Sequence, residues 1–453
     1  MTRDKLRQLP AVDALLQTEL ADALIANYGR SAVLTAIRAT LDAVRQHILN
    51  GADDMPDLTP QHVLERVQNH LIASFMPTLC PVINATGVII HTNLGRAPLS
   101  EQAQQAVQAI SASYSNLEFN LTTGKRGSRY THAEDALTEL TGAEGALVVN
   151  NNAGALVLML FALAQGQEVV ISRSQLVEIG GGFRIPDIMA QSGAHLVEVG
   201  TTNRTRLSDY RRALSEQTAM LLRVHSSNFR IVGFVEETPL VQMASLAHEH
   251  GVCCVDDLGS GAFFDTELYG LLHEPTVQES VQAGADLVLF SGDKLLGGPQ
   301  SGILIGRADL IAELKRHPLA RALRADKLCY AGLSATLDHY RRGEALTKIP
   351  IWQMISSPLD ALQTRAQAWR DALGQGQLLA DQSTVGGGSL PGTTLPTVVL
   401  ALSVPDATAS ASRLRYADQP IITRIHDDRL LFDPRTVLPQ QDDLFLQALK
   451  AHL

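Results

Sequence analysis

The stretch Leu287-Val-Leu-Phe-Ser-Gly-Asp-Lys294-Leu-Leu-Gly-Gly-Pro-Gln-Ser-Gly-Ile-Leu-Ile305 places a lysine directly after a short apolar run. Four apolar residues followed by Ser-Gly-Asp-Lys predict a buried strand that ends in a tight turn, and a second apolar run follows the glycines. Lysine normally keeps its ammonium group in water, so this position is unusual. Burial lowers the pKa of a lysine and frees its amine to form a Schiff base with an aldehyde cofactor. The alternative is a surface hairpin whose lysine is solvated.

The length and composition of the chain indicate a soluble globular protein of several domains. At 453 residues the chain is longer than one ordinary domain, so two or three domains are expected. Hydrophobic residues make up 45% and charged residues 19% of the chain, as in ordinary globular proteins. The formal net charge of −10 gives no whole-molecule attraction to a polyanion, so contact with a nucleic acid would need a local basic patch.

The cysteines and the N-terminus predict a cytoplasmic protein. The four cysteines show no Cys-x-x-Cys spacing, so we expect neither a metal site nor a disulfide framework. The first twelve residues include several charged residues and a proline, whereas the core of a signal peptide would be apolar. The apolar run at residues 156–164 is far too short to span a membrane.

The sequence divides into three regions that differ in the spacing of their apolar residues. Residues 1–75 carry apolar residues at helical spacing and predict a helical domain. This region contains seven Lys and Arg residues and nine Asp and Glu residues, so it is not a basic arm. Residues 76–325 alternate short apolar runs with helix-length segments, which predicts an α/β domain with a mostly parallel sheet covered on both faces. Residues 326–453 predict a long helical region and then a small C-terminal α+β domain. The predicted strands of the central sheet are residues 146–149, 168–171, 194–199, 220–224, 252–255 and 287–290.

The residues just after the predicted strands are informative, because ligands of open α/β sheets bind beyond the carboxyl ends of the strands. Asn151 and Asn152 follow one strand directly before Ala153, where the next helix begins. Free backbone N–H groups and the helix dipole at such a helix start suit a phosphate group, and Ser291 after another strand can bind the same phosphate. An ordinary asparagine helix cap is the alternative.

Asp257 follows the predicted strand at residues 252–255, in the run Asp256-Asp257-Leu-Gly-Ser-Gly261. A carboxylate at a buried strand end is costly unless it meets a cation. A protonated pyridine nitrogen is such a cation, and the pairing makes the pyridine ring a stronger electron sink. An aspartate that caps a turn is the alternative. A phosphate site, Asp257 and Lys294, in this order on successive strands, are typical of pyridoxal-phosphate enzymes of the aminotransferase-like group called fold type I.

Three arginines stand where they can bind an anion. Arg321 and Arg324 are three residues apart on a helix predicted at residues 319–327, so both guanidinium groups can face one point. Arg96 lies in a glycine turn before another predicted helix. Arginine binds phosphate-like anions through paired N–H groups. The alternative is a solvated basic helix face, because other basic residues lie nearby.

Several longer motifs extend this pattern. The most specific is Ser291-Gly-Asp-Lys-Leu-Leu-Gly-Gly-Pro-Gln300. The others are Val82-Ile-Asn-Ala-Thr-Gly87, His91-Thr-Asn-Leu-Gly-Arg96, Glu178-Ile-Gly-Gly-Gly-Phe-Arg-Ile-Pro186, Glu198-Val-Gly-Thr-Thr-Asn-Arg204 and His317-Pro-Leu-Ala-Arg-Ala-Leu-Arg-Ala-Asp-Lys327. In these motifs the chain resembles bacterial selenocysteine synthase, the L-seryl-tRNA(Sec) selenium transferase family. The resemblance runs from about residue 9 to the C-terminus and is dense between residues 81 and 327.

The resemblance implies an enzyme that converts L-seryl-tRNA(Sec) to L-selenocysteinyl-tRNA(Sec) with selenophosphate, through a dehydroalanyl-tRNA bound to pyridoxal phosphate. It implies that Lys294 holds the cofactor and that Asp257 holds the ring nitrogen protonated. Arginines of the family bind the phosphate of selenophosphate. The implied cofactor-binding positions are Lys294, Asp257, Asn151, Asn152, Ala153, Ser291 and Asn228, and the implied substrate-binding positions are Arg96, Arg321 and Arg324.

The resemblance also implies a homodecamer, a pentamer of dimers, whose N-terminal domains bind tRNA. Because the chain carries a charge of −10, such binding would rely on the shape of the tRNA and on few phosphate contacts. Arg30, Arg38 and Arg45 are the candidates for these contacts.

Two other functions fit parts of the sequence. A related pyridoxal-phosphate lyase acting on a free small amino acid or sugar amine would share the cofactor residues but would not need residues 1–75. A tRNA-binding scaffold without catalysis would not need Lys294 and Asp257. The group that protonates the hydroxyl leaving Cβ stays open among His91, His225 and the cofactor phosphate.

Overall fold

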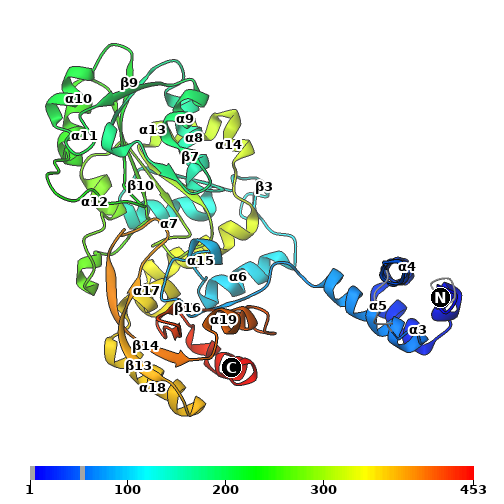
Figure 1. Ribbon diagram of the computed structural model, residues 1–453. Coiled ribbons are helices and arrows are strands. Elements are labelled where there is room, and N and C mark those ends of the chain that lie inside the picture. Colours follow the sequence, from blue (N-terminus) through cyan, green and yellow to red (C-terminus); the bar gives the residue numbers. More distant parts are fainter. Residues whose placement is uncertain (1–5, 51–56) are drawn as a thin grey trace. The chain divides into compact units, whose positions relative to one another are not determined.

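The computed structural model describes residues 6–50 and 57–453 of a chain that forms two compact units, Met1–Pro81 and Val82–Leu453 (Figure 1). Predictions that fall on residues 1–5 and 51–56 lie outside the described residues. No described helix combines the length and the apolar character needed to cross a membrane.

The first unit consists of helices packed around a core of their own. Thr18 begins one helix by accepting a hydrogen bond from the Ala21 N–H, and Pro60 begins another at a position where no N–H is needed. Apolar residues at helical spacing, such as Leu24 and Ile37, form the core. The described part of this unit is therefore built of helices. Its helices are α2 (Val12–Leu16), α3 (Glu19–Tyr28), α4 (Arg30–Leu49) and α5 (Pro60–Phe75).

The second unit is built on a seven-stranded sheet with the strand order β4-β12-β11-β10-β9-β5-β8. β12 runs antiparallel to both of its neighbours, β11 and β4, whereas the pairs β11-β10, β10-β9, β9-β5 and β5-β8 are parallel, which confirms the predicted mostly parallel sheet. Each predicted strand is present within a residue or two, except that β10 continues through Asp257 to Gly259. The strands are β4 (Gly145–Val149), β5 (Glu168–Ser172), β8 (His195–Val199), β9 (Thr218–Val224), β10 (Cys253–Gly259), β11 (Leu287–Ser291) and β12 (Gly302–Gly306).

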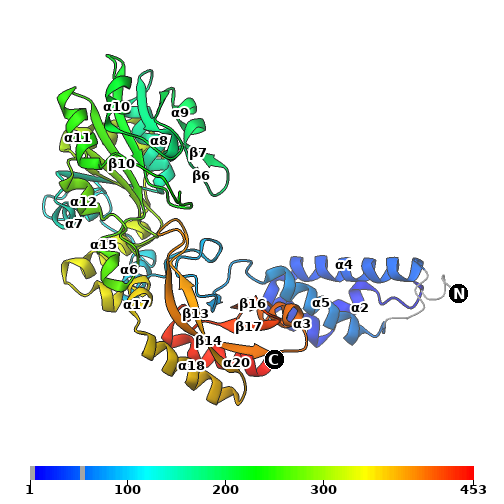
Figure 2. The same cartoon turned by 60° about the vertical axis from the view of Figure 1, so that its left-hand side comes forward.

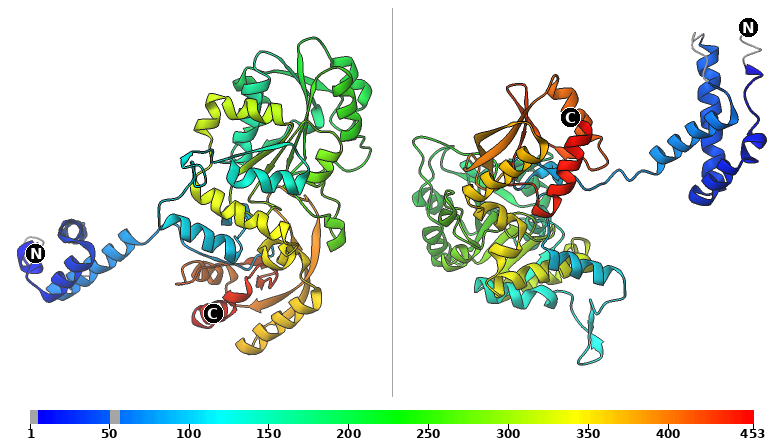
Figure 3. Two further views of the ribbon diagram at one scale, coloured as in Figure 1. Left: turned by 180° about the vertical axis from the view of Figure 1, so that it is seen from behind. Right: turned by 90° about the horizontal axis from the view of Figure 1, so that it is seen from below.

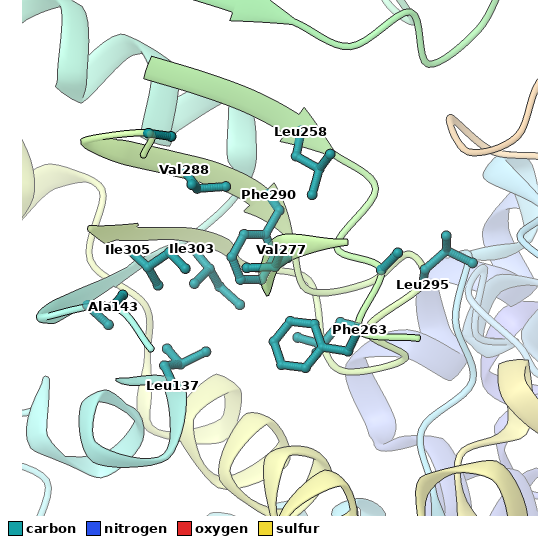
Figure 4. Close-up of a cluster of buried hydrophobic side chains, with 14 of the residues drawn as sticks. Leu137, Ala143, Leu258, Phe263, Val277, Val288, Phe290, Leu295, Ile303 and Ile305 are labelled. Atoms are coloured by element: carbon teal, nitrogen blue, oxygen red, sulfur yellow. The ribbon is translucent and has the colours of Figure 1, made fainter. Parts of the chain in front are cut away.

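Helices cover both faces of this sheet, so its central strands are apolar on both sides. On one face Val288 and Phe290 of β11 pack beside Ile303 of β12 and Leu137 of α7 (Figure 4). The alternate residues of β11, including Leu289, pack on the other face against α8 and α13. The first face is covered by α7 (Thr131–Thr141), α11 (Leu240–Glu249), α12 (Val277–Gln282) and α15 (Lys327–Arg341), and the second by α8 (Asn152–Leu163), α9 (Ile185–Ser192) and α13 (Ala308–Arg316).

A smaller antiparallel sheet with the order β13-β14-β17-β16 lies in the C-terminal part of the second unit (Figure 2). Trp369 of α18 and Phe445 of α20 meet in its core, with ring centroids 4.4 Å apart. Val385, just after β13, accepts a hydrogen bond from the Ile90 N–H at 2.7 Å, which ties the glycine-rich loop after β13 to residues near the start of the unit. The elements are β13 (Gln377–Thr384), β14 (Thr394–Ser403), β16 (Arg424–His426), β17 (Arg429–Phe432), α18 (Leu359–Leu373), α19 (Ala407–Arg415) and α20 (Asp442–His452).

Short elements complete the second unit, and the β2–β3 hairpin projects from it (Figure 3). They are β1 (Ile83–Asn84), η1 (Thr92–Leu94), α6 (Glu101–Ser111), β2 (Phe119–Asn120), β3 (Lys125–Arg126), η2 (Arg173–Gln175), β6 (Glu178–Ile179), β7 (Phe183–Arg184), α10 (Leu207–Ala213), η3 (Thr266–Tyr269), α14 (Pro318–Ala322), α16 (Ala345–Lys348), α17 (Pro350–Ser356), β15 (Ile421–Ile422) and η4 (Pro439–Gln441).

The prediction of a single helix at residues 319–327 is wrong. Helix α14 ends at Ala322, and the next residues pair with the end of β4 instead: the Asn150 N–H donates to the Leu323 carbonyl at 2.8 Å. Asp326 then begins α15, because its side chain accepts from the first backbone N–H groups of that helix. Arg324 is therefore held beside the end of β4 rather than on the helix of Arg321.

Candidate active site

Lys294 lies three residues beyond β11, in a turn that the backbone fixes on both sides. The Leu295 N–H donates to the Ser260 carbonyl at 3.0 Å, and the Gly298 N–H donates to the Gly292 carbonyl at 2.8 Å. The Lys294 side chain is buried, with 7% of the residue exposed, and its Nζ lies 3.5 Å from the carbonyl oxygen of Gly388. The surface hairpin with a solvated lysine is thereby excluded.

Burial lowers the pKa of the Lys294 amine, and the positive charge of Arg96 lowers it further. The carboxylates of Asp257, Asp293 and Glu274 oppose this shift. Desolvation is the largest of these effects, so a larger fraction of the amine is uncharged than in a solvated lysine. An uncharged amine is the form that attacks an aldehyde.

Two glycines leave room for this amine. A Cβ atom at Gly388 would lie 2.8 Å from Nζ of Lys294, and one at Gly259 would lie 3.8 Å from it. Gly388 has a φ of +89°, a conformation that side chains disfavour, and it belongs to three consecutive glycines after β13. Gly388 lies 94 residues beyond Lys294 in the sequence.

Asp257 lies on β10 beside this turn and is also buried. Its Oδ1 accepts a hydrogen bond of 2.8 Å from Nδ2 of Asn152, whereas Oδ2 accepts no side-chain hydrogen bond from any described residue. Burial raises the pKa of the Asp257 carboxyl to about 6, although Asn152 and the charge of Lys294 act against the rise. A cation at Oδ2 would favour the ionised form.

The N-terminus of α8 lies next to β11 and β12. Asn151 caps α8, since its side chain accepts from the Gly154 N–H at 2.7 Å, and this part of the alternative reading is correct. The backbone N–H groups of Asn152 and Ala153 come before the first hydrogen bonds of the helix and keep their donor capacity. A Cβ on Gly302 would come within 2.1 Å of the Asn151 carbonyl oxygen, and Gly302 pairs with Ser291. The structure thus brings the predicted phosphate-binding positions together.

Arg96 approaches the lysine from the segment before α6. Its Nη1 lies 2.8 Å from Oδ2 of Asp293, the residue before Lys294, and the Ala97 N–H donates to the Asp293 carbonyl. Arg96 has a φ of +64°, which is costly for a residue with a side chain. Two contacts therefore hold a strained arginine next to the lysine turn.

Arg324 joins a group of arginines around one carboxylate. Its Nη1 lies 3.7 Å from Oε1 of Glu118, which also pairs with Arg129 at 2.6 Å and with Arg126 at 3.1 Å. Three arginines on one carboxylate leave an excess of positive charge beside the end of β4. Arg321 is exposed on α14. Between residues 82 and 453 the structure shows no carboxylate that pairs with both Arg96 and one of these two arginines.

Asn228, His225 and His91 each contact a different segment of the chain. The side-chain amide of Asn228 donates to the Glu178 carbonyl of the β6–β7 hairpin at 2.8 Å. The His225 N–H donates to the Asp257 carbonyl at 3.0 Å, so His225 lies at the site. The carbonyl of His91 accepts from the Arg96 N–H at 3.1 Å. The cofactor role of Asn228 stays a prediction.

Buried polar atoms without a hydrogen-bond partner gather in the segments around Lys294. Within residues 6–50 and 57–453 ten buried side-chain nitrogen and oxygen atoms have no such partner. Six of the ten belong to segments that carry or flank the site: His91 Nδ1, Asn152 Oδ1, His225 Nε2, Ser260 Oγ, Glu274 Oε1 and Ser389 Oγ. Buried polar atoms are normally satisfied, so this concentration fits a polar ligand. The residues present therefore fit pyridoxal phosphate, which offers a phosphate, a hydroxyl and a ring nitrogen.

Comparisons with known proteins agree with this geometry. The family model described as L-seryl-tRNA selenium transferase matches residues 82–438, and the model described as selenocysteine synthase N terminal matches residues 6–45. The L-seryl-tRNA(Sec) selenium transferase of Carboxydothermus hydrogenoformans is 46% identical, covering 99% of this chain and 98% of its own length. That of Hyphomonas neptunium is 47% identical, covering 96% of both chains.

A solved structure, that of D-glucosaminate-6-phosphate ammonia-lyase, shares the fold. It is 22% identical, covers 82% of this chain and 95% of its own length, and has a TM-score of 0.58. The predicted aminotransferase-like, fold type I architecture is confirmed. With the site and the fold in agreement, the family match over residues 82–438 and the identity along nearly the whole length show that this chain belongs to the L-seryl-tRNA selenium transferase family.

Proposed function

We propose that this chain converts L-seryl-tRNA(Sec) to L-selenocysteinyl-tRNA(Sec), with pyridoxal phosphate held by Lys294 and selenophosphate as the selenium donor. The observation that carries the proposal is the buried amine of Lys294, whose charge state is governed by burial, by Arg96 and by three nearby carboxylates. The curated relatives named for this reaction support it. Because the substrate is an aminoacylated tRNA, we place the reaction in the cytoplasm.

Pyridoxal phosphate, when bound, supplies an electron sink that lets the Cα proton and the Cβ hydroxyl leave the seryl group. Lys294 would hold the cofactor covalently, and its amine, once freed, would take the Cα proton. Asp257, held in place by Asn152, would keep the ring nitrogen protonated, and a cation beside this buried carboxyl would favour its ionised form. The N–H groups of Asn152 and Ala153, with Ser291, would bind the cofactor phosphate.

Arginines at the site support an anionic second substrate. Arg96 is pinned beside Lys294 by Asp293, and Arg324 belongs to a group of three arginines that share Glu118. Such a surplus of guanidinium groups suits the phosphate of selenophosphate. Arg321 completes the proposed set from the exposed surface of α14.

The first unit supports contact with tRNA. A groove of about 570 Å³ along α4 is lined by Arg30, Ser31 and His70, and a neighbouring groove of about 550 Å³ is lined by His47, Arg66 and His70. Guanidinium, imidazole and hydroxyl groups can bind RNA phosphates. Of the other arginines predicted on α4, Arg38 is exposed and Arg45 is paired with Asp42.

A homodecamer, as the family resemblance implies, is part of the proposal. Large apolar side chains are exposed on the second unit at Tyr114 and Leu121 near the β2–β3 hairpin, and at Val232 and Phe234 before α11. Clustered exposed apolar side chains are typical of association surfaces. Sedimentation of the purified protein tests the assembly, since a monomer at micromolar concentration contradicts it.

The decisive experiment compares Lys294→Ala with Lys450→Ala, which removes an exposed lysine of α20. Purified proteins are incubated with seryl-tRNA(Sec), selenophosphate and pyridoxal phosphate, and the aminoacyl group is identified after hydrolysis. We expect the wild type and Lys450→Ala to form selenocysteinyl-tRNA and to show the visible absorbance of the lysine-bound cofactor. We expect Lys294→Ala to lose both. Conversion of free serine with the charged tRNA left unchanged would overturn the proposal in favour of the lyase.

A second pair of variants tests the glycine that covers the lysine. Gly388→Ala and Gly392→Ala both place an alanine at a positive φ, so their backbone cost is similar. Only the first puts a Cβ 2.8 Å from Nζ of Lys294, whereas nothing lies within 4 Å of a Cβ at Gly392. We expect cofactor absorbance to be weakened only in Gly388→Ala. Equal absorbance in the two variants would place Gly388 away from the reacting amine.

A further inference from the structure

Glu274 is a buried carboxylate with no role in the reaction as described so far. It lies in the loop between η3 and α12, with 2% of the residue exposed, and its Oε1 has no hydrogen-bond partner among the described residues. A buried carboxylate without partners is costly, because the interior cannot replace the hydration of its charge. Such a group is retained only where something else compensates for it.

The loop holds Glu274 in place from both sides. Its backbone N–H donates to Oγ1 of Thr266 at 2.9 Å, and Thr266 is itself fully buried. Two residues further on, Thr276 caps α12 with a reciprocal pair of hydrogen bonds to Glu279. The position of the carboxylate is therefore set by the fold rather than by a flexible loop.

His225 is the cation-forming group that this carboxylate faces. Its Nε2 lies 3.2 Å from Oε1 of Glu274, within ion-pair distance but without the angles of a hydrogen bond. The backbone N–H of His225 donates to the Asp257 carbonyl, so the imidazole belongs to the strand end that carries the cofactor-binding aspartate. The charged groups around this pair are Asp257 on β10 and Lys294 after β11. The charge of Glu274 raises the pKa of Lys294, and the charge of His225 lowers the pKa of Asp257.

We propose that Glu274 is a positioning residue that orients the imidazole of His225 and pairs with its charged form at the active site, and that His225 gives its proton to the hydroxyl leaving the seryl group. The proposal rests on the proposed function. Because Nε2 faces Glu274, Nδ1 is the ring nitrogen left to exchange a proton with the substrate. As the Cβ–O bond breaks, its electron pair leaves with oxygen, which takes the proton and departs as water. The Cα proton passes to Lys294. Its later transfer from Lys294 to His225 restores the starting protonation state of both residues.

A titration of the histidine side chains tests the control of His225 by Glu274 without any reaction. The cofactor-free protein is labelled at histidine, and its imidazole resonances are followed with pH, with His225→Asn identifying the signal of His225. We expect the titration midpoint of His225 to be lower in Glu274→Gln than in the wild type, because an opposite charge within ~4 Å favours the charged form. Glu267→Gln, an exposed carboxylate of the same region, should leave the midpoint unchanged. An unmoved midpoint in Glu274→Gln overturns the proposal.

Kinetics test the proton transfer itself. We expect His225→Asn to slow the loss of water from seryl-tRNA by about a hundredfold, and Glu274→Gln by about tenfold, with KM nearly unchanged. Glu274→Asp should recover part of the rate, and the double variant should be no slower than His225→Asn, because Glu274 acts only through His225. A double variant slower than His225→Asn by the full tenfold contradicts the proposal. If the wild-type protein does not react with seryl-tRNA, the proposed function is refuted. In that case the titration alone tests whether Glu274 controls His225.

Discussion

Asp256 and Asp257 are neighbours on β10 whose side chains point to opposite faces of one sheet. The exposed fractions of the two residues are 0% and 5%, so burial does not distinguish them. Asp256 accepts two hydrogen bonds of 2.7 Å from Arg223 and a third of 2.7 Å from Ser280. Asp257 accepts one side-chain bond, from Asn152. The difference between them is how far the protein itself satisfies each carboxylate.

We interpret this difference as that between a structural carboxylate, Asp256, and a proposed functional one, Asp257. The charge of Asp256 is met within the fold by a guanidinium that binds both of its oxygens. The carboxylate of Asp257 is left with an open oxygen, and burial raises its pKa to about 6. A fold keeps such an under-satisfied group where a ligand can complete it. The comparison therefore predicts that equivalent changes at the two positions affect different properties.

The largest expected effect is on activity, in Asp257→Asn. An amide cannot favour the protonated ring nitrogen, so we expect turnover to fall by about a thousandfold, equivalent to ~4 kcal/mol of transition-state stabilisation. The free energy of unfolding of the cofactor-free protein should not fall at neutral pH, because the variant loses a desolvated charge. Steady-state kinetics and urea denaturation measure the two quantities. A stable variant with near-normal turnover would remove Asp257 from the site.

Asp256→Asn should show the reverse pattern. The change leaves the largely buried guanidinium of Arg223 without its counter-charge, and breaking a buried pair in this way costs about 3 kcal/mol. We expect the midpoint of urea denaturation to fall while the turnover of the folded fraction stays within about twofold of the wild type. A variant that unfolds normally but is inactive would reverse the assignment of the two aspartates.

The two aspartates also show what the sequence can predict. Alternation along a strand puts neighbouring residues on opposite faces, and the position of Asp257 relative to Lys294 in the sequence is the basis of its predicted role. The partners of Asp256 come from β9 and α12, and no local sequence pattern specifies a pairing between such distant positions. The strands and the lysine turn were predictable because their signal lies within a few consecutive residues.

Errors and omissions arose where distant segments meet. The helix predicted through Arg324 is broken because the backbone of Leu323 pairs with β4, a contact that helical spacing cannot reveal. Gly388 reaches Lys294 from 94 residues further along the chain. Glu274 lies in a loop without a recognisable motif. Three consecutive glycines between β13 and β14 were the one local signal that could have identified Gly388.

A third prediction concerns the pH dependence of stability. The pKa of Asp257 is about 6 in the folded protein and near 3.8 when unfolded, so the folded state binds this proton more tightly. Stability from this group therefore rises as pH falls from about 7 to about 4, by up to ~3 kcal/mol for a difference of about two pKa units. Urea denaturation of the cofactor-free wild type and of Asp257→Asn isolates the effect. We expect Asp257→Asn to be the more stable protein at pH 7 and the two proteins to converge near pH 4. Parallel curves would show that Asp257 is not strained by its burial.

The smallest expected effects come from removing one hydrogen bond at each aspartate. Asn152→Ala takes away the donor to Asp257 that lowers its pKa, so the carboxyl becomes harder to ionise beside the cofactor. We expect turnover to fall by about tenfold, or ~1.4 kcal/mol, with a weaker affinity for pyridoxal phosphate. Ser280→Ala takes one of three donors from Asp256 and should cost about 1 kcal/mol of stability without a change in turnover.

These two variants give the sharpest form of the comparison, because each removes a single neutral donor from a buried carboxylate. Asn152→Ser, which keeps a shorter donor, should lie between the wild type and Asn152→Ala in cofactor affinity. If Asn152→Ala lowered stability as Ser280→Ala does and left the cofactor affinity unchanged, the bond to Asp257 would serve the fold rather than the site. The distinction between the two faces of β10 would then rest on the charge of Arg223 alone, and a single open carboxylate oxygen would not be enough to identify a functional aspartate.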